Sequence, residues 1–180
     1  MKITSAANAR VKELLKLKKH ARQRQEEAVY LVEGLRMCKE APHHEIVQIW
    51  VAESFQKYHP EFVKEFEMIR TFYEVPDDLF QRLSDTQHPQ GVLCVMRQKR
   101  YTVGQILQQE NPLLMVLDHL QDPGNLGTIL RTGEAAGVTG VILSAGCADI
   151  YNPKVIRSTM GSIYRMPFVY VEDLPEVLEQ

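Results

Sequence analysis

The sequence lacks the features that mark several common classes of protein. Its three cysteines, Cys38, Cys94 and Cys147, are widely spaced and form no Cys-x-x-Cys pair, so neither a disulfide framework nor a zinc site is indicated. No apolar run approaches the roughly 20 residues of a membrane span, and the N-terminus has no signal-peptide core. We therefore expect a cytoplasmic protein that does not contact membranes.

The nucleotide-binding fingerprints are absent as well. Gly124-Asn-Leu-Gly127 does not fit the Gly-x-Gly-x-x-Gly pattern of dinucleotide-binding enzymes, and no Gly-Lys-Ser/Thr follows the glycines. His43 and His44 have no third metal ligand nearby, so we expect no metal site. His88, in a loop before an apolar run, fits a plain turn better than a contact with a bound base, although both interpretations stay open.

Charge is distributed unevenly along the chain. The first 24 residues hold eight basic residues and one acidic residue, so a balance of +7 there leaves −9 for the rest of a chain whose net charge is −2. Residues 8–24 have apolar side chains at helical spacing, Val11, Leu14 and Leu15, with basic residues around them. This predicts a basic helix that is either a solvated surface or a nucleic-acid contact through Lys18, Lys19 and Arg22.

The apolar pattern predicts two α/β domains after that helix. Strand-like runs at 28–32, 46–51, 69–73 and 92–96 alternate with short helices at 35–41, 60–67 and 77–83. We assign residues 1–25 to the basic helix, 26–97 to a small α/β domain and 98–110 to a linker with a short helix at 103–109. Residues 111–180 form the second domain.

The second domain begins with a strand, a turn and a helix. The apolar run 113–117 predicts a strand buried on both faces, Asp122-Pro-Gly-Asn-Leu-Gly127 supplies turn chemistry, and we expect Asn125 to cap the helix that follows. Further strands are predicted at 138–143 and 167–171, with a helix capped by Asn152 between them and another from 174 to 180. Strand, helix and strand at this spacing predict parallel crossovers.

Two glycines stand inside the first of these helices. Gly127 and Gly133 each cost about 1 kcal/mol relative to alanine, so we expect close approach of a ligand or another chain segment to offset them. Asn152-Pro-Lys-Val-Ile-Arg-Ser-Thr-Met-Gly-Ser162 is a second polar cluster, whose Val155, Ile156, Thr159, Met160 and Ile163 we expect to face inward. We expect the two clusters to form two walls of one site.

These two clusters closely resemble the first two motifs of the SpoU (TrmH-like) branch of the SPOUT RNA 2′-O-methyltransferases. The resemblance extends upstream to Tyr30-Leu-Val-Glu-Gly34 and Gln90-Gly-Val-Leu93, which are similar to the two ends of the family's RNA substrate-binding domain. Within the family, the ribosomal-RNA-directed type is the nearest pattern. The resemblance implies a parallel-sheet domain of the trefoil-knot kind.

The resemblance also implies a reaction and roles for individual residues. The reaction is methyl transfer from S-adenosyl-L-methionine to a ribose 2′-hydroxyl of structured RNA, ribosomal RNA being the expected substrate and transfer RNA the alternative. Catalytic roles fall to Asn125, Arg131, Glu134 and Thr159, with Glu134 orienting Arg131 from one turn away. Gly161 would contact the cofactor, while Lys154 and Arg157 would hold RNA phosphates.

The family's third motif, which completes the knot, is not found within these residues, and we expect it to lie beyond Gln180. The resemblance then implies that the 180-residue form binds RNA but binds the cofactor weakly, so that it could be inactive by itself, and that the complete protein is a homodimer. An RNA-binding module without methyltransferase activity remains the competing hypothesis. Asn125, Arg131 and Glu134 in one stretch favour the enzyme, because binding alone needs only cations.

Overall fold

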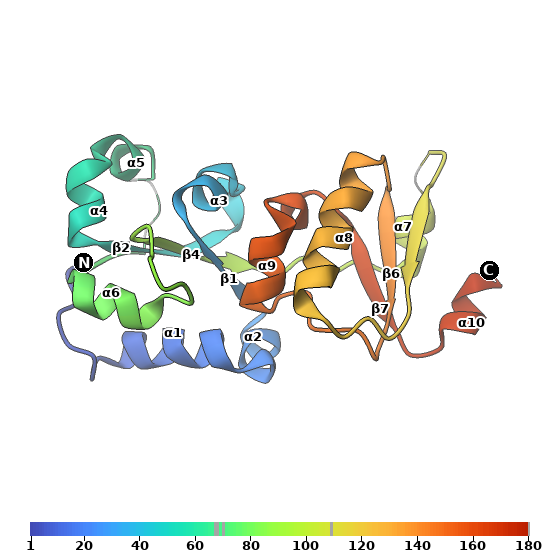
Figure 1. Ribbon diagram of the computed structural model, residues 1–180, viewed down its shortest axis with the longest axis horizontal. Helices are drawn as coiled ribbons and strands as arrows, with labels where there is room; N and C mark the ends of the chain where they lie inside the picture. Colours follow the sequence, from blue (N-terminus) through green and yellow to red (C-terminus); the bar gives the residue numbers. More distant parts are fainter. Residues whose placement is uncertain (67–68, 70, 109, 180) are drawn as a thin grey trace. The chain divides into compact units, whose positions relative to one another are not determined.

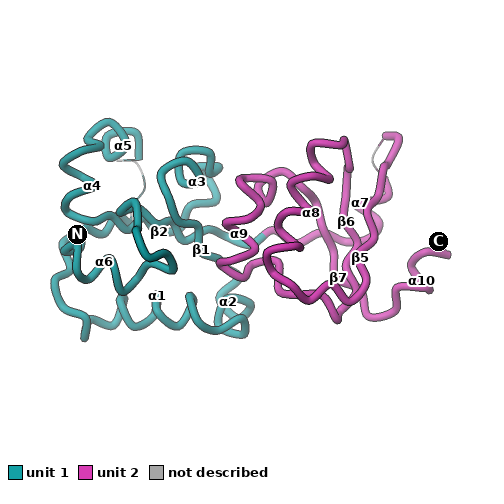
Figure 2. Tube along the Cα trace, in the orientation of Figure 1, with its two compact units in different colours: residues 1–98 teal, residues 99–180 magenta. Residues whose placement is uncertain are grey.

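A computed structural model describes residues 1–66, 69, 71–108 and 110–179 of the chain (Figure 1). Glu67, Arg70, Gln109 and Gln180, which our predicted elements include, lie outside the described residues. The chain divides into two compact units, residues 1–98 and 99–180 (Figure 2). Each unit has its own sheet and its own core.

The N-terminal unit is built on a four-stranded mixed sheet. Its strands are β1 (Val29–Glu33), β2 (Ile46–Ala52), β3 (Phe72–Val75) and β4 (Val92–Arg97), in the order β1-β4-β2-β3. β4 runs antiparallel to both of its neighbours, whereas β2 and β3 are parallel. The central strand β4 is buried along its length up to Met96, as its continuous apolar run predicts.

Short helices connect these strands. They are α3 (Leu35–Glu40), α4 (Glu53–Tyr58), α5 (Pro60–Glu65) and α6 (Asp77–Leu83), together with the 3-10 turn η1 (His43–Glu45). α6 has the bounds that the sequence predicts, but α4 was not predicted. The largest side chains buried in this unit are aromatic: Trp50, Phe62, Phe66 and Phe80.

The basic N-terminal segment forms two helices where one was predicted. α1 (Ala9–Lys19), capped by Asn8, ends at His20, whose extended backbone starts α2 (Ala21–Glu27). The break allows Arg24 to fold back, and its guanidinium donates a hydrogen bond of 2.8 Å to the Leu17 carbonyl at the end of α1. Arg24 is only 3% exposed, so it stabilises the helix pair and is not part of the basic surface.

The C-terminal unit contains a three-stranded sheet in the order β5-β6-β7, with strands β5 (Leu114–Leu117), β6 (Gly140–Ser144) and β7 (Phe168–Val171). All three strands are parallel, which confirms the predicted crossovers. The helices are α7 (Val103–Leu107), α8 (Pro123–Ala135), α9 (Pro153–Thr159) and α10 (Leu174–Leu178), with the 3-10 turn η2 (Ser162–Tyr164).

Two features of this unit differ from the expectations. β6 is buried throughout, but β5 pairs only with β6 in the described part of the chain and leaves Val116 37% exposed, so the prediction of burial on both faces was wrong. The segment predicted as a linker packs onto the unit: Ile106 is buried against Gly140, and Lys99 donates to the Tyr164 carbonyl at 2.9 Å.

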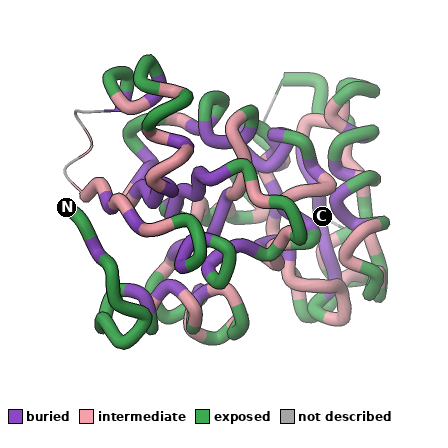
Figure 3. The backbone as a smooth tube through the Cα atoms, turned by 60° about the vertical axis from the view of Figure 1, so that its left-hand side comes forward, coloured by how far each residue is buried: buried purple, intermediate pink, exposed green. Residues whose placement is uncertain are grey.

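Figure 3 shows where the buried residues lie along the chain, and they make up most of strands β1, β2, β4 and β6. Cys38 and Cys94 are buried free thiols and Cys147 is half-buried. Within the described ranges, no helix combines the length and apolar character that crossing a bilayer requires. Among the same residues, no three histidine, cysteine or acidic side chains gather as metal ligands would.

Candidate active site on helices α8 and α9

The first turn of α8 is organised by Asp122. Its carboxylate accepts a hydrogen bond of 2.7 Å from the Asn125 backbone N–H, and Pro123 occupies the first helical position. The prediction that Asn125 caps the helix was therefore wrong, because the extended residue before the proline takes that place. The Asn125 side chain is exposed and forms no hydrogen bond within the described residues, so its amide is available to a ligand.

Gly127 brings the two motifs into direct contact. A Cβ atom at Gly127 would lie 2.4 Å from the Ser158 Cβ and 2.5 Å from the Val155 carbonyl oxygen, both on α9. Close approach of another chain segment thus offsets the helical glycine, as predicted. One turn earlier, a Cβ at Gly124 would lie 3.7 Å from the Lys154 Cε. The first turns of α8 and α9 therefore adjoin.

Arg131 lies one turn beyond Gly127 on α8. Its side chain is exposed and makes no hydrogen bond or ion pair within the described part of the chain. A guanidinium presents five fixed donors and stays charged at any physiological pH. Arg131 is thus a cation whose hydrogen-bonding capacity is not used by the fold.

Glu134 does not orient Arg131, contrary to the prediction. Its carboxylate binds Arg165 instead, with one hydrogen bond from Nε and a second of 3.1 Å from Nη2. These bonds from Arg165 hold the pKa of the Glu134 carboxyl below its usual value. The pair joins α8 to the segment before β7, so Glu134 acts on the position of the helix.

The second motif begins as predicted. Asn152 caps α9 by accepting a hydrogen bond of 2.9 Å from the Lys154 N–H, and Lys154 is exposed beside α8. Arg157, one turn later, is half-buried, and Ser158 donates to the Lys154 carbonyl at 2.9 Å. α9 thus contributes two cations on the helix that packs against α8.

Three residues near the end of α9 differ in their accessibility. Thr159 is fully buried and donates its hydroxyl to the Ile156 carbonyl at 2.7 Å, so this hydroxyl is used within the helix and does not reach the surface. Met160, predicted to face inward, takes the left-handed conformation and is 38% exposed. Gly161 is buried with φ of 101°, a backbone conformation that glycine adopts without strain.

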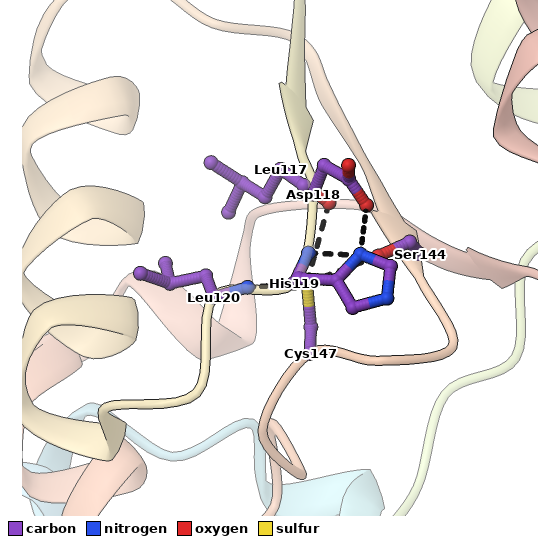
Figure 4. A network of polar contacts seen from close by, with 6 residues as sticks. All are labelled: Leu117, Asp118, His119, Leu120, Ser144 and Cys147. Atoms are coloured by element: carbon purple, nitrogen blue, oxygen red, sulfur yellow. Dashed lines mark hydrogen bonds and ion pairs between the residues drawn. The ribbon is translucent and has the colours of Figure 1, made fainter.

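A polar network that the sequence did not predict lies at the carboxyl ends of strands β5 and β6 (Figure 4). The Ser144 Oγ accepts from the His119 N–H at 2.9 Å, and His119 Nδ1 lies 2.5 Å from the Asp118 carboxylate. Hydrogen bonds from Ser144 and then His119 lower the pKa of the Asp118 carboxyl. Cys147 Sγ donates to the Leu117 carbonyl at 3.2 Å. The network fixes the carboxyl ends of these parallel strands, the edge at which such sheets bind ligands.

Gly146 leaves room for the His119 ring in this network. A Cβ at Gly146 would lie 2.5 Å from the His119 Cδ2, and His119 itself has a positive φ of 49°. A histidine in the left-handed region is uncommon. The only signal in the sequence was Gly146 in a loop after an apolar run, which did not identify its partner.

In the N-terminal unit, the three predicted RNA-binding residues have different environments. Lys18 donates its ammonium group to the carbonyls of Arg82 and Ser84 at the end of α6, so it is tied to the fold. Arg22 is exposed and pairs with Glu26 at 2.7 Å. Lys19 is exposed without a partner in the described residues, as are Lys12 and Lys16, which were not singled out from the sequence. Positions 12, 16 and 19 share one face of α1.

Comparisons with known proteins agree with this arrangement. Residues 112–180 match the SpoU rRNA Methylase family, and residues 8–94 match the MRM3-like substrate binding domain. The 23S rRNA (guanosine(2553)-2′-O)-methyltransferase RlmP of Bacillus subtilis is 31% identical over 181 residues, which cover 99% of this chain and 68% of that protein. An uncharacterized tRNA/rRNA methyltransferase of Synechocystis is 40% identical over 111 residues, or 60% of this chain and 39% of that protein.

Solved structures are similar over nearly the whole chain. The AdoMet-bound rRNA methyltransferase from Sinorhizobium meliloti has a TM-score of 0.84 and 28% identity, with 99% of this chain and 68% of that chain covered. The SpoU methyltransferase AviRb from Streptomyces viridochromogenes, in complex with AdoMet, has a TM-score of 0.82 and 28% identity, with 96% and 66% covered. The chain therefore spans between about two fifths and two thirds of the lengths of these relatives. The two motifs are in contact on α8 and α9, and the Bacillus protein aligns with 99% of this chain. The chain therefore belongs to the SpoU family of rRNA methylases.

Proposed function

We propose that this protein transfers a methyl group from S-adenosyl-L-methionine to a ribose 2′-hydroxyl of ribosomal RNA. The observation that carries the proposal is the state of Arg131: an exposed guanidinium without a partner in the described residues, on the helix that packs through Gly127 against the cationic helix α9. The Bacillus 23S rRNA (guanosine(2553)-2′-O)-methyltransferase RlmP supports it, since it aligns with 99% of this chain.

The residues of this chain fit part of a cofactor site. Gly161 offers a buried backbone at a positive φ, and the carboxyl ends of β5 and β6 are held by the network around Asp118. The Sinorhizobium and AviRb structures are AdoMet-bound, which supports the same cofactor here. When bound, the cofactor supplies a methyl group on a sulfonium ion.

The protein must hold the ribose and stabilise charge on its oxygen. Arg131 would donate hydrogen bonds to the 2′-oxygen and to the neighbouring phosphate, stabilising the charge on that oxygen while the hydroxyl proton passes to solvent. Asn125, six residues earlier on the same helix, would position the nucleotide through its unused amide. Lys154 and Arg157 would bind phosphates, while Glu134, through Arg165, would keep α8 in place. We assign Thr159 a structural role because its hydroxyl is buried and bonded.

The N-terminal unit would bind the same RNA. Lys12, Lys16 and Lys19 form an exposed basic face on α1, and the matched domain family is described as substrate-binding. We further propose that the protein acts in the cytoplasm and works as a homodimer. Sedimentation of the full-length protein at several concentrations tests the dimer, and a single monomeric species throughout would contradict it.

Ribosomal RNA from cells lacking the gene, incubated with the full-length protein and labelled S-adenosyl-L-methionine, tests the activity. We expect label in one 2′-O-methylated nucleotide of the rRNA. RNA that is bound but never labelled would instead favour the competing hypothesis of a binding module without catalysis.

A further inference from the structure

The N-terminal unit contains an open cleft that the proposed methyl transfer does not use. Its volume is about 300 Å³, and it is bordered by the start of α4, by α6 and by the loop between α6 and β4, residues 84–91. This volume is at the lower end of the range for small-molecule sites, which is roughly 300–1,000 Å³. The lining used below consists of Asp77, Gln81, His88, Pro89 and Gln90, with Ser54 at the edge of α4.

The loop that borders the cleft is fixed at its first end by hydrogen bonds to the Glu33 side chain. The Glu33 carboxylate accepts hydrogen bonds from the Asp85 N–H at 2.9 Å and from the Thr86 hydroxyl at 2.8 Å, and also from the Ser84 hydroxyl. Three consecutive loop residues therefore bind one acidic side chain. Loops that are held in this way lose little conformational entropy when a ligand binds.

The other end of the loop is fixed as tightly. Gln90 Oε1 accepts a hydrogen bond of 2.7 Å from the Leu35 N–H at the start of α3. Gly91 has φ of 85°, and a Cβ atom there would lie 2.8 Å from the Phe55 Cβ, so no other residue fits without displacement. The wall of the cleft is thus formed before any ligand arrives.

The polar atoms of the lining are only partly used by the protein. Asp77 Oδ1 accepts from the Ser54 hydroxyl, which leaves Oδ2 without a partner in the described residues. Gln81 donates its amide to the Gln87 carbonyl at 3.0 Å, which leaves its own carbonyl oxygen. Gln90 uses its oxygen on Leu35, which leaves its NH₂ group. Asp77, Gln81 and Gln90 therefore offer two acceptors and one amide donor, and the side chains of Ser54, Gln87 and His88 add further polar atoms to the lining.

The charge of the lining selects the class of ligand. Among the described residues, no lysine or arginine lines the cleft and one carboxylate does, so the lining disfavours a phosphate group. A flat group could lie against the exposed imidazole of His88 and the ring of Pro89. Two acceptors and one donor match the Watson–Crick edge of guanine, which has donors at N1 and N2 and an acceptor at O6. Uracil, cytosine and adenine each lack the pair of adjacent donors.

We propose that this cleft binds an unpaired guanine base of the RNA, with Asp77 and Gln81 accepting from N1 and N2 and Gln90 donating to O6. The proposal deepens the proposed function, on which it rests for its ligand class. Sequence-specific recognition of RNA commonly uses bases that are splayed out, stacked on flat side chains and hydrogen-bonded along this edge. The bound guanine is a recognition base, whose pairing with the protein gives the register of the RNA.

Fluorescence anisotropy with the full-length protein tests this proposal. The probes are single-stranded oligouridine strands that carry one central guanine, adenine, cytosine, uracil or hypoxanthine. We expect the guanine strand to bind roughly tenfold more tightly than the uracil strand, and hypoxanthine, which lacks the N2 amino group, to lose most of that gain. Equal affinity for all five strands would overturn the proposal.

A matched pair of variants separates the cleft from general charge. Asp77→Asn keeps an oxygen for Ser54 and replaces the free acceptor by a donor, so we expect the guanine preference to disappear. Asp78→Asn removes the same charge at the next residue, which is exposed and does not line the cleft, and should keep the preference. Equal losses in both variants would contradict the proposal.

If Asp77→Asn fails to fold, which thermal melting detects, the comparison of guanine with hypoxanthine in the wild type still decides the question. The methylation assay is independent of it. Methylated rRNA together with equal binding of all five strands would refute the guanine site alone. A guanine preference without methylation would refute the proposed activity alone.

Discussion

Glu134 forms its ion pair with Arg165, which lies 31 residues later in the sequence, and not with Arg131 on the preceding turn of the same helix. This choice separates two tasks. The Glu134–Arg165 pair fixes α8 against the segment before β7, and Arg131 keeps all of its donors for a ligand. The consequence is that the two arginines should respond differently to substitution.

Arg131→Lys should lower methylation of rRNA by about 100-fold or more, because a lysine keeps the charge but loses the fixed fork of donors. The midpoint of thermal unfolding should not change, since Arg131 forms no hydrogen bond within the described residues. Initial rates with labelled cofactor measure the effect. The control is Arg100→Lys, an exposed arginine of the same unit, which should keep full activity. Comparable rates for both variants would exclude Arg131 from the reaction.

Glu134→Gln should destabilise the protein by up to about 1 kcal/mol at pH 7, the range for exposed pairs, since Arg165 is half exposed. The folded pKa of Glu134 is lowered by Arg165, so the carboxylate's contribution is complete above the unfolded pKa of about 4.3 and is lost as the pH falls through the lower folded pKa. Urea unfolding at pH 7 and at about pH 3.5 should reveal a difference that shrinks at the acidic value.

The control for this pH dependence is Glu172→Gln, an exposed glutamate of the same unit without a partner in the described residues. It should change the free energy of unfolding little at either pH. A loss of stability in Glu134→Gln that stays constant with pH would indicate a steric effect and would contradict the ion-pair explanation.

Gly127→Ala should destabilise the C-terminal unit by about 1–3 kcal/mol, because the new methyl group would fall 2.4 Å from the Ser158 Cβ and force α8 and α9 apart. Gly104→Ala, in α7, is the matched control: its nearest atom is the Thr102 hydroxyl oxygen at 4.0 Å, so helix propensity should raise stability slightly. Thermal melting of both variants decides. Equal melting points would show that the helices tolerate separation.

Replacing Lys12, Lys16 and Lys19 together by glutamine should weaken RNA binding and reduce the slope of log affinity against log salt by about 2, as expected for three lost phosphate contacts. A triple variant at Lys39, Lys57 and Lys64, which are exposed elsewhere in the unit, serves as the control and should bind almost like the wild type. Similar losses in the two triple variants would mean that the contact is not localised on α1.

The sequence predicted the elements whose signals are local. α6 has the predicted bounds because Pro76 fixes its start and the acidic pair at its first turn favours a helix. The Asn152 cap, the parallel strands and the close approach at Gly127 also followed from short patterns. The break at His20 did not, since it depends on a contact between Arg24 and the Leu17 carbonyl.

Contacts between distant residues account for the site residues that were misread. The partner of Glu134 and the engagement of Lys18 by α6 both require the tertiary fold. The cap at Asp122 depends on a local signal that our prediction of Asn125 did not use, namely the proline directly after Asp122. The exposed face of Lys12, Lys16 and Lys19 could have been found from helical spacing alone.

Lys18 differs chemically from its neighbours on the same helix because its ammonium group binds two backbone carbonyls. Acetylation requires that the lysine amine attack the reagent, and an ammonium group held by two backbone carbonyls is less free to reach it. In a mass-spectrometric footprint of the intact protein, Lys12, Lys16 and Lys19 should be modified early and protected by RNA, whereas Lys18 should be modified late whether RNA is present or not. A count of basic residues in this segment thus overstates the charge that an RNA encounters.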